Sequence, residues 1–196
     1  MSSVRTVGKS RLESRSGTQR SKRLSDKGSE PCALVRRFGA RLVEAANGAP
    51  ILDVGCGEGR NAIYLARLGA AVICLDRNSE LLRLLPSAKR IVPLHLDLTT
   101  GRWPFAPCQL GGIVSVHFLM PALFRQFESS LSLGGYLLIE TVPAHGGNFI
   151  ELPNEGELRR AFAKVFQFEF FKEKKAGPVG CGKVTVRLLA RRVAPG

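Results

Sequence analysis

Short apolar runs alternate along this chain with segments in which apolar residues recur every three or four positions. Uninterrupted runs of this kind indicate strands that are buried on both faces of a sheet. They occupy about residues 50–54, 71–75, 91–96, 113–116 and 136–140. Helical spacing indicates helices at about residues 34–46, 61–68, 79–85 and 122–131. Ser79 is expected to cap the third of these helices, and Pro86 cannot continue it.

The last third of the chain continues the alternation. Asn154 and Glu157 have the spacing of a capping box, which predicts a helix from Asn154 to about Val165. Two further strands are expected near residues 166–172 and 183–190, joined by a loop that contains Gly177 and Pro178. The pattern predicts an α/β fold: a Rossmann-like, doubly wound, seven-stranded sheet. It should be mostly parallel, with one antiparallel strand near the C-terminus.

Residues 1–30 differ from the rest in composition. They are rich in Ser, Arg and Lys, with eight basic and three acidic side chains, and show no apolar periodicity. Such a segment cannot bury enough surface to offset its ordering entropy, so we expect a disordered basic tail at 1–30 and one folded domain at 31–196. The tail is either dispensable, a nucleic-acid-binding arm or an organelle transit peptide.

Charge and cysteine content limit which partners, metals and cellular locations are expected for this protein. The net charge of +13 leaves a nucleic-acid partner possible, but no basic cluster is interleaved with aromatics, so this partner is not favoured. Five cysteines without a C-x-x-C pair disfavour both disulfides and a zinc site, and no metal is expected. No apolar stretch is long enough for a membrane span, and no secretory signal is evident. These features favour a cytoplasmic protein; the oligomeric state is left open.

Glycines follow the first predicted strand, in the run from Asp53 to Gly59. In an open parallel sheet, ligands bind beyond the carboxyl ends of the strands, and glycines let the backbone approach them closely. Dinucleotide folds have the spacing G-x-G-x-x-G, whereas this loop has G-x-G-x-G. Asp53 precedes the loop by two residues; its carboxylate would repel a pyrophosphate but attract a ligand that carries an ammonium and a sulfonium.

These residues resemble the class I S-adenosylmethionine (SAM)-dependent methyltransferases, over about residues 31–190. The likeness is carried by the stretch from Asp53 through the glycine loop to Gly69, and Arg60-Asn61 directly after the loop is typical of the small bacterial tellurite-resistance group. The resemblance implies SAM as the cofactor. It also implies that Asp53 and the loop glycines hold the methionine end, that Asp76 binds the ribose hydroxyls, and that Asp97 meets the adenine amino group.

The position of Asp76, at the end of the second strand and 17 residues after Gly59, supports the ribose role independently. Alone, Asp76 and Asp97 could each be turn residues; together and in order after successive strands they favour a cofactor site. The full predicted set of cofactor-binding residues is Asp53, Gly55, Cys56, Gly57, Gly59, Asn61, Asp76, Arg77, Asp97, Leu98 and Val116. One departure is that Leu110-Gly111-Gly112 stands where the family carries an Asp before the fourth strand.

Methyl transfer needs an aligned acceptor, and a general base only where the acceptor must lose a proton. His117, at the end of the fourth strand, is the candidate catalytic residue, although the sequence favours the simpler interpretation of a histidine hydrogen-bonded in the pocket wall. His145, in a glycine-containing loop, is a weaker candidate base. Phe118, Phe149 and Trp103 are candidates for an acceptor pocket, or for the core.

Three functions remain open. The favoured one is a methyltransferase that acts on a small-molecule acceptor by in-line displacement. The alternatives are an RNA or protein methyltransferase that uses the basic surface and tail, and a SAM-binding protein without catalysis. No Asn-Pro-Pro-aromatic motif follows the fourth strand, which disfavours adenine or glutamine amino groups as acceptors. The acceptor itself is not identified by the sequence.

Overall fold

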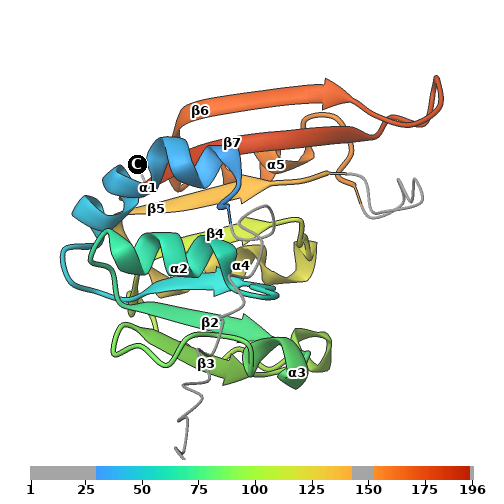
Figure 1. Ribbon diagram of the computed structural model, residues 1–196. Coiled ribbons are helices and arrows are strands. Elements are labelled where there is room, and N and C mark those ends of the chain that lie inside the picture. Colours follow the sequence, from blue (N-terminus) through green and yellow to red (C-terminus); the bar gives the residue numbers. More distant parts are fainter. Residues whose placement is uncertain (1–29, 143–151, 195–196) are drawn as a thin grey trace, which may run out of the picture.

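A seven-stranded sheet forms the centre of the protein, with the strand order β3-β2-β1-β4-β5-β7-β6 (Figure 1). The computed structural model describes residues 30–142 and 152–194; the predicted tail lies outside these residues apart from Glu30. The strands are β1 (Ile51–Val54), β2 (Val72–Asp76), β3 (Ile91–His95), β4 (Leu110–Val116), β5 (Leu131–Glu140), β6 (Phe166–Lys175) and β7 (Val184–Arg192). The helices are α1 (Ala33–Ala46), α2 (Arg60–Arg67), α3 (Ser79–Leu82), α4 (Phe124–Ser130) and α5 (Glu157–Phe162), with 3-10 turns η2 (Leu98–Thr100) and η3 (Pro121–Leu123).

Helices cover both faces of the sheet, as a doubly wound fold requires (Figure 1). One apolar core packs α1 and α2 against sheet residues such as Ile51, and it includes Leu42 and Leu65. The other packs α4 and α5 against the opposite face, where Phe127 and Phe162 are almost completely buried. Successive strand residues therefore face different cores. The predicted α/β architecture is confirmed.

The strands from β3 to β5 in the sheet order are parallel to one another, and among the described residues β7 is the one strand that runs in the opposite direction. β1 pairs in parallel with β2 on one side and with β4 on the other. β7 is inserted between β5 and β6 and is antiparallel to both. In this register Glu140, the last residue of β5, lies opposite Arg187 of β7. No helix among the described residues is long and apolar enough to cross a membrane.

Several predicted boundaries differ from the observed ones. The third helix is shorter than expected because it ends at Leu82, and its cap is Asn78, whose side-chain oxygen accepts from the backbone N–H groups of Glu80 and Leu81. Asn78 offers an amide oxygen one residue earlier than the expected cap, Ser79, and the chain uses it.

The expected capping box before α5 is only half formed. Glu157 accepts from the backbone N–H of Asn154, as predicted, but the helix begins after Gly156, which has φ +71° and no capping side chain. The side chain of Asn154 donates to Glu157 rather than capping the helix. The helix is therefore shorter at both ends than the spacing indicated.

The glycines ahead of the fourth strand have a packing role that their sequence does not reveal. β4 begins at Leu110, so Gly111 and Gly112 lie within the strand rather than before it. A Cβ on Gly111 would lie 2.7 Å from both Cα and Cβ of Ala46, in the last turn of α1. At the place where the resemblance leads one to expect an acidic residue, this chain has a glycine. The absence of a side chain there lets α1 pack closely against the sheet.

Substitution of Gly111 by Ala should destabilise the fold, because the new methyl group collides with the Ala46 backbone and the helix must move. Overpacking of this kind costs about 1–3 kcal/mol. The matched control is Gly112→Ala on the same strand, where the nearest atom is a movable side-chain carbon of Ile51 at 3.3 Å. Urea unfolding measures both; equal free energies of unfolding for the two variants would contradict this interpretation of Gly111.

Candidate cofactor and acceptor site

The glycine loop after β1 lies at the edge of the sheet where the parallel strands end. Gly55, Gly57 and Gly59 all have positive φ, at +66°, +55° and +75°. The backbone N–H groups of Gly55 and Cys56 both donate to the carbonyl of Leu75, at 2.8 and 3.0 Å. The loop is thereby fastened to the end of β2, which is possible because glycine adopts this backbone at no steric cost.

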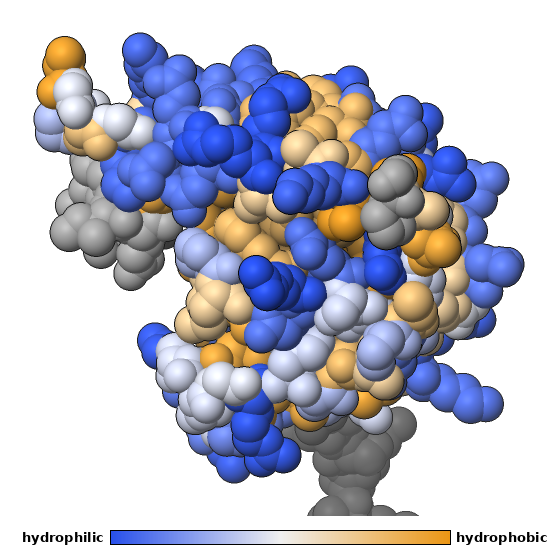
Figure 2. Space-filling model, turned by 180° about the vertical axis from the view of Figure 1, so that it is seen from behind, coloured by the Kyte–Doolittle hydropathy of each residue, from blue (hydrophilic) through white to orange (hydrophobic). Residues whose placement is uncertain are grey.

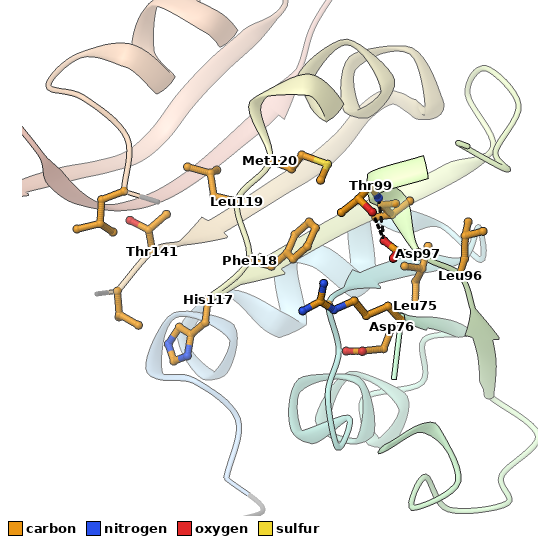
Figure 3. Close-up of a pocket in the computed structure, with 15 residues that line it drawn as sticks. Leu75, Asp76, Leu96, Asp97, Thr99, His117, Phe118, Leu119, Met120 and Thr141 are labelled. Atoms are coloured by element: carbon orange, nitrogen blue, oxygen red, sulfur yellow. Dashed lines mark hydrogen bonds between the residues drawn. The ribbon is translucent and has the colours of Figure 1, made fainter. Parts of the chain in front are cut away.

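Beside this loop is a cavity of about 370 Å³. Seven of the candidate site residues line it: Gly55, Asp76, Arg77, Asp97, Leu98, His117 and Phe118. Figure 3 shows Asp76 and Asp97 on one side, where β2 and β3 end, and His117 on the other, after β4, with Thr141 beyond it. The structure thus brings together side chains that follow four different strands and lie far apart in the chain.

Asp76 ends β2 and is held by two backbone donors. Its Oδ2 accepts from the N–H of Gly57 at 2.8 Å, and its Oδ1 accepts from the N–H of Asn78 at 2.8 Å. The carboxylate therefore connects the glycine loop to the turn before α3. Each carboxylate oxygen has a further acceptor site, so Asp76 can also accept from ligand hydroxyls.

Asp97 follows β3 and caps the η2 turn. Its Oδ1 accepts from both the backbone N–H and the hydroxyl of Thr99, at 2.9 and 2.8 Å. These hydrogen bonds hold the pKa of Asp97 below its ordinary value. The side chain both forms a turn and lines the cavity, so the two interpretations of this residue are compatible.

Asp53 lies in the middle of the sheet and is only 1% exposed. Burial raises its pKa to about 7, although the backbone N–H of Ala62 and the charge of Arg60 oppose the shift. Among the described residues, no group makes a hydrogen bond to its Oδ2. A buried, unpaired carboxylate oxygen is costly, and a cationic ligand group would remove that cost.

The other predicted cofactor residues do not line the cavity. Gly59 leaves room for Leu85, because a Cβ there would lie 2.1 Å from Leu85 Cδ2. The Oδ1 of Asn61 accepts from the backbone N–H of Cys32 at 2.9 Å and so joins the starts of α1 and α2. Cys56 and Val116 are buried. A Cβ on Gly57, by contrast, would have no atom of the described residues within 4 Å, so the loop surface is open there.

Apolar side chains that the sequence did not single out form the rest of the wall. They include Leu96, Leu119, Met120 and Leu152. Phe118 also lines the cavity, close to Gly55. In Figure 2 the surface is hollowed at this edge of the sheet, and hydrophobic surface is visible inside the hollow. Trp103 instead packs on Phe105 and Phe127. His145 and Phe149 lie outside the described residues.

A second group of polar residues surrounds the end of β5. His117 has φ +61°, and its backbone N–H donates to the carbonyl of Glu140 at 2.8 Å. The Nε2 of His117 is 4.0 Å from Oε1 of Glu140, and the Nε of Arg187 is 3.2 Å from Oε2. Sequence reasoning found His117 but gave no role to Glu140 and Arg187, because only the antiparallel register places Arg187 there.

Comparison with known proteins agrees with this geometry. Residues 51–135 match the family described as "Methyltransferase domain". A protein named probable S-adenosyl-L-methionine-dependent methyltransferase TehB, from Haemophilus influenzae (strain 10810), is 29% identical over 100 residues, which are 45% of this chain and 34% of that protein. Over residues 51–135 the chain is therefore similar to methyltransferase domains, and the curated relative that it matches is named as SAM-dependent. The match spans only about a third of the curated relative.

Solved structures show the same fold as this methyltransferase domain. The crystal structure of TehB from Haemophilus influenzae has a TM-score of 0.60 and 24% identity, over 78% of this chain and 61% of that one. Geranyl diphosphate C-methyltransferase from Streptomyces coelicolor A3(2) has a TM-score of 0.59 and 14% identity, over 81% and 77% of the two chains. The sequence resemblance to SAM-dependent methyltransferases is confirmed.

The residues present fit SAM as a ligand of this site. The unpaired oxygen of Asp53 suits an ammonium group, and the open surface at Gly57 lets a ligand reach the backbone. Asp76 and Asp97 supply acceptors along the cavity. Among the described residues no group of three or more His, Cys, Asp and Glu side chains could hold a metal ion. The individual contacts to SAM remain predictions.

Replacing Asp76 by Ala should weaken SAM binding at least about tenfold, because a hydrogen bond to a charged group contributes about 1.5–3 kcal/mol. Glu58→Ala is the matched control: it removes one carboxylate from the same loop, at an exposed position outside the cavity wall. Isothermal calorimetry measures both affinities. If Asp76→Ala binds SAM as tightly as the control, Asp76 does not hold the cofactor.

SAM binding should depend on pH through Asp53. With a pKa of about 7, this carboxyl is partly protonated near neutrality, and a cation beside it lowers the pKa and releases the proton. Affinity should therefore rise as the pH is raised through the pKa of about 7, with proton release in the same range. Calorimetry in two buffers of different ionisation enthalpy measures this release. Asp53→Asn should release fewer protons; an unchanged number would refute the role of Asp53.

Proposed function

We propose that this protein transfers the methyl group of SAM to a small-molecule acceptor that binds between the ends of β4 and β5. The observation that carries the proposal is one cavity whose wall holds two acids from the β2 and β3 ends on one side and His117 on the other. The acids suit the polar parts of the donor. The histidine and the apolar residues after β4 are then left to meet the acceptor.

The size and lining of the cavity support a small acceptor. A volume of about 370 Å³ is at the lower end of the range for small-molecule sites, which is about 300–1,000 Å³. Phe118, Leu119 and Met120 present apolar surface beside His117. The Streptomyces enzyme was crystallised with geranyl diphosphate, so this fold can hold an acceptor of that size.

The chemistry places modest demands on the protein. SAM supplies a methyl carbon activated by the positively charged sulfur. The residues of this chain have to align the acceptor and exclude water, which the apolar wall after β4 favours. Where the acceptor carries a proton, His117 can receive it, and its side chain is 42% exposed, so the proton can pass on to solvent.

The proposal includes a cytoplasmic location, supported by the five cysteines, none of which is in a disulfide. RNA or protein remains the alternative acceptor, for which the basic composition is the argument. Deletion of residues 1–30 can distinguish a small-molecule acceptor from an RNA or protein acceptor, because this segment carries eight of the basic side chains.

The full-length protein should convert SAM to S-adenosylhomocysteine with at least one class in a panel of thiols, metalloid oxyanions, small carboxylates and RNA. We expect turnover with a small molecule, unchanged by deletion of residues 1–30 and lost in Asp76→Ala. Product formation is measured by mass spectrometry. Turnover with RNA alone, lost on deletion of the tail, would support the alternative. SAM binding without turnover on the whole panel would support a non-catalytic protein.

A further inference from the structure

A buried carboxylate lies beside His117, at the end of β5. Glu140 is the last residue of β5, and its side chain is only 6% exposed. A buried carboxylate is costly unless an opposite charge faces it. Glu140 has Arg187 for this purpose, but it also has the imidazole of His117 on its other side.

The two oxygens of this carboxylate face different partners. Oε2 is 3.2 Å from the guanidinium Nε of Arg187, and Oε1 is 4.0 Å from the Nε2 of His117. The pair with Arg187 is an ion pair without the alignment of a hydrogen bond. The distance to His117 is too long for a hydrogen bond and short enough for a strong electrostatic effect on a protonated imidazole.

The backbone fixes this arrangement. His117 adopts a left-handed conformation, with φ +61°, directly after the end of β4. Its N–H donates to the carbonyl of Glu140 itself, at 2.8 Å. Residues other than glycine are seldom left-handed, and such residues concentrate at functional sites. Main chain and side chain therefore both join His117 to Glu140, at the wall of the cavity.

We propose that Glu140, itself paired with Arg187, is a positioning residue that stabilises the protonated form of His117 during methyl transfer. This inference rests on the proposed function, and it narrows the acceptor to one whose nucleophilic atom carries a proton: a hydroxyl, a thiol or an N–H group. The lone pair of this nucleophilic atom forms the bond to the methyl carbon. The bond between that carbon and sulfur breaks, and its electron pair stays on sulfur. The acceptor proton passes to the imidazole, and the resulting positive charge faces Glu140.

Other charges near His117 have to be considered with Glu140. The Cys32 thiol, at the start of α1, interacts electrostatically with both Glu140 and Arg60, and burial raises its pKa, so it is a neutral neighbour. The charged groups on the other wall of the cavity are Asp76, Arg77 and Asp97. Of the carboxylates in this set, Glu140 is the one with a contact of 4.0 Å to the imidazole.

The decisive measurement needs no acceptor, so its outcome can be distinguished from a failure of the proposed function. The full-length protein has three histidines, His95, His117 and His145, whose ring signals can be followed by NMR in protein labelled at histidine. The His117 signal is assigned by its loss in His117→Ala. Each ring is then titrated across the range in which imidazole changes its charge, in the wild type and in Glu140→Gln.

Loss of the Glu140 charge should shift the titration midpoint of the His117 ring to lower pH by about half to one unit, because the protonated ring loses a nearby negative charge. Glu169→Gln is the matched control. Glu169 is also a partly buried glutamate paired with an arginine, Arg41, but it lies in β6, away from the cavity. This variant should leave the His117 midpoint unchanged.

An unchanged midpoint in Glu140→Gln overturns the proposal, whatever the acceptor is. If that variant does not fold, Glu140→Asp keeps the charge near Arg187 and should give a smaller shift in the same direction. With an acceptor from the panel, Glu140→Gln should lower kcat more than it raises KM, and move the acidic limb of the pH–rate profile to lower pH. A fall in activity without that movement would indicate a merely structural ion pair.

Discussion

The parallel pairing of β1 with both β2 and β4 is the constraint on which the site depends. Because the three strands run in one direction, their carboxyl ends meet at one edge of the sheet. The glycine loop, Asp76 and His117 follow these ends, so the pairing brings them to one cavity. The loop is then held to β2 by its own backbone, through the carbonyl of Leu75 and the carboxylate of Asp76.

The same pairing explains the electrostatic state of Asp53. Its strand is buried between two neighbours and covered on both faces, so the carboxylate cannot reach water. The fold accepts a carboxyl with a raised pKa at the base of the loop. Groups with a shifted pKa concentrate at functional sites, where a ligand can supply the opposite charge that the protein itself does not place beside them. A cationic ligand group beside Asp53 would stabilise its carboxylate form.

The residues of the donor half are predicted from local features of the sequence, and the structure places five of them around one cavity. Glycine spacing, an acid two residues before the loop and acids after successive strands can all be read along the chain. The features that could not be predicted depend on contacts between residues that are far apart in the sequence. The packing role of Gly111 depends on Ala46 of α1, and the side chain of Asn61, a predicted cofactor residue, accepts from the backbone N–H of Cys32. Glu140 and Arg187 were missed for the same reason.

The two halves of the site therefore depend on different kinds of residues. The predicted donor half is made of backbone and short side chains at the ends of parallel strands, where a change disturbs the fold of the glycine loop. The proposed acceptor half depends on a pairing between β5 and β7, in which Arg187 faces outward at 51% exposure. Side chains of this kind can change without disturbing the core. A fold with a constant methyl donor can thereby serve different acceptors, and the acceptor has to be argued from Glu140, Arg187 and His117 rather than from the fold.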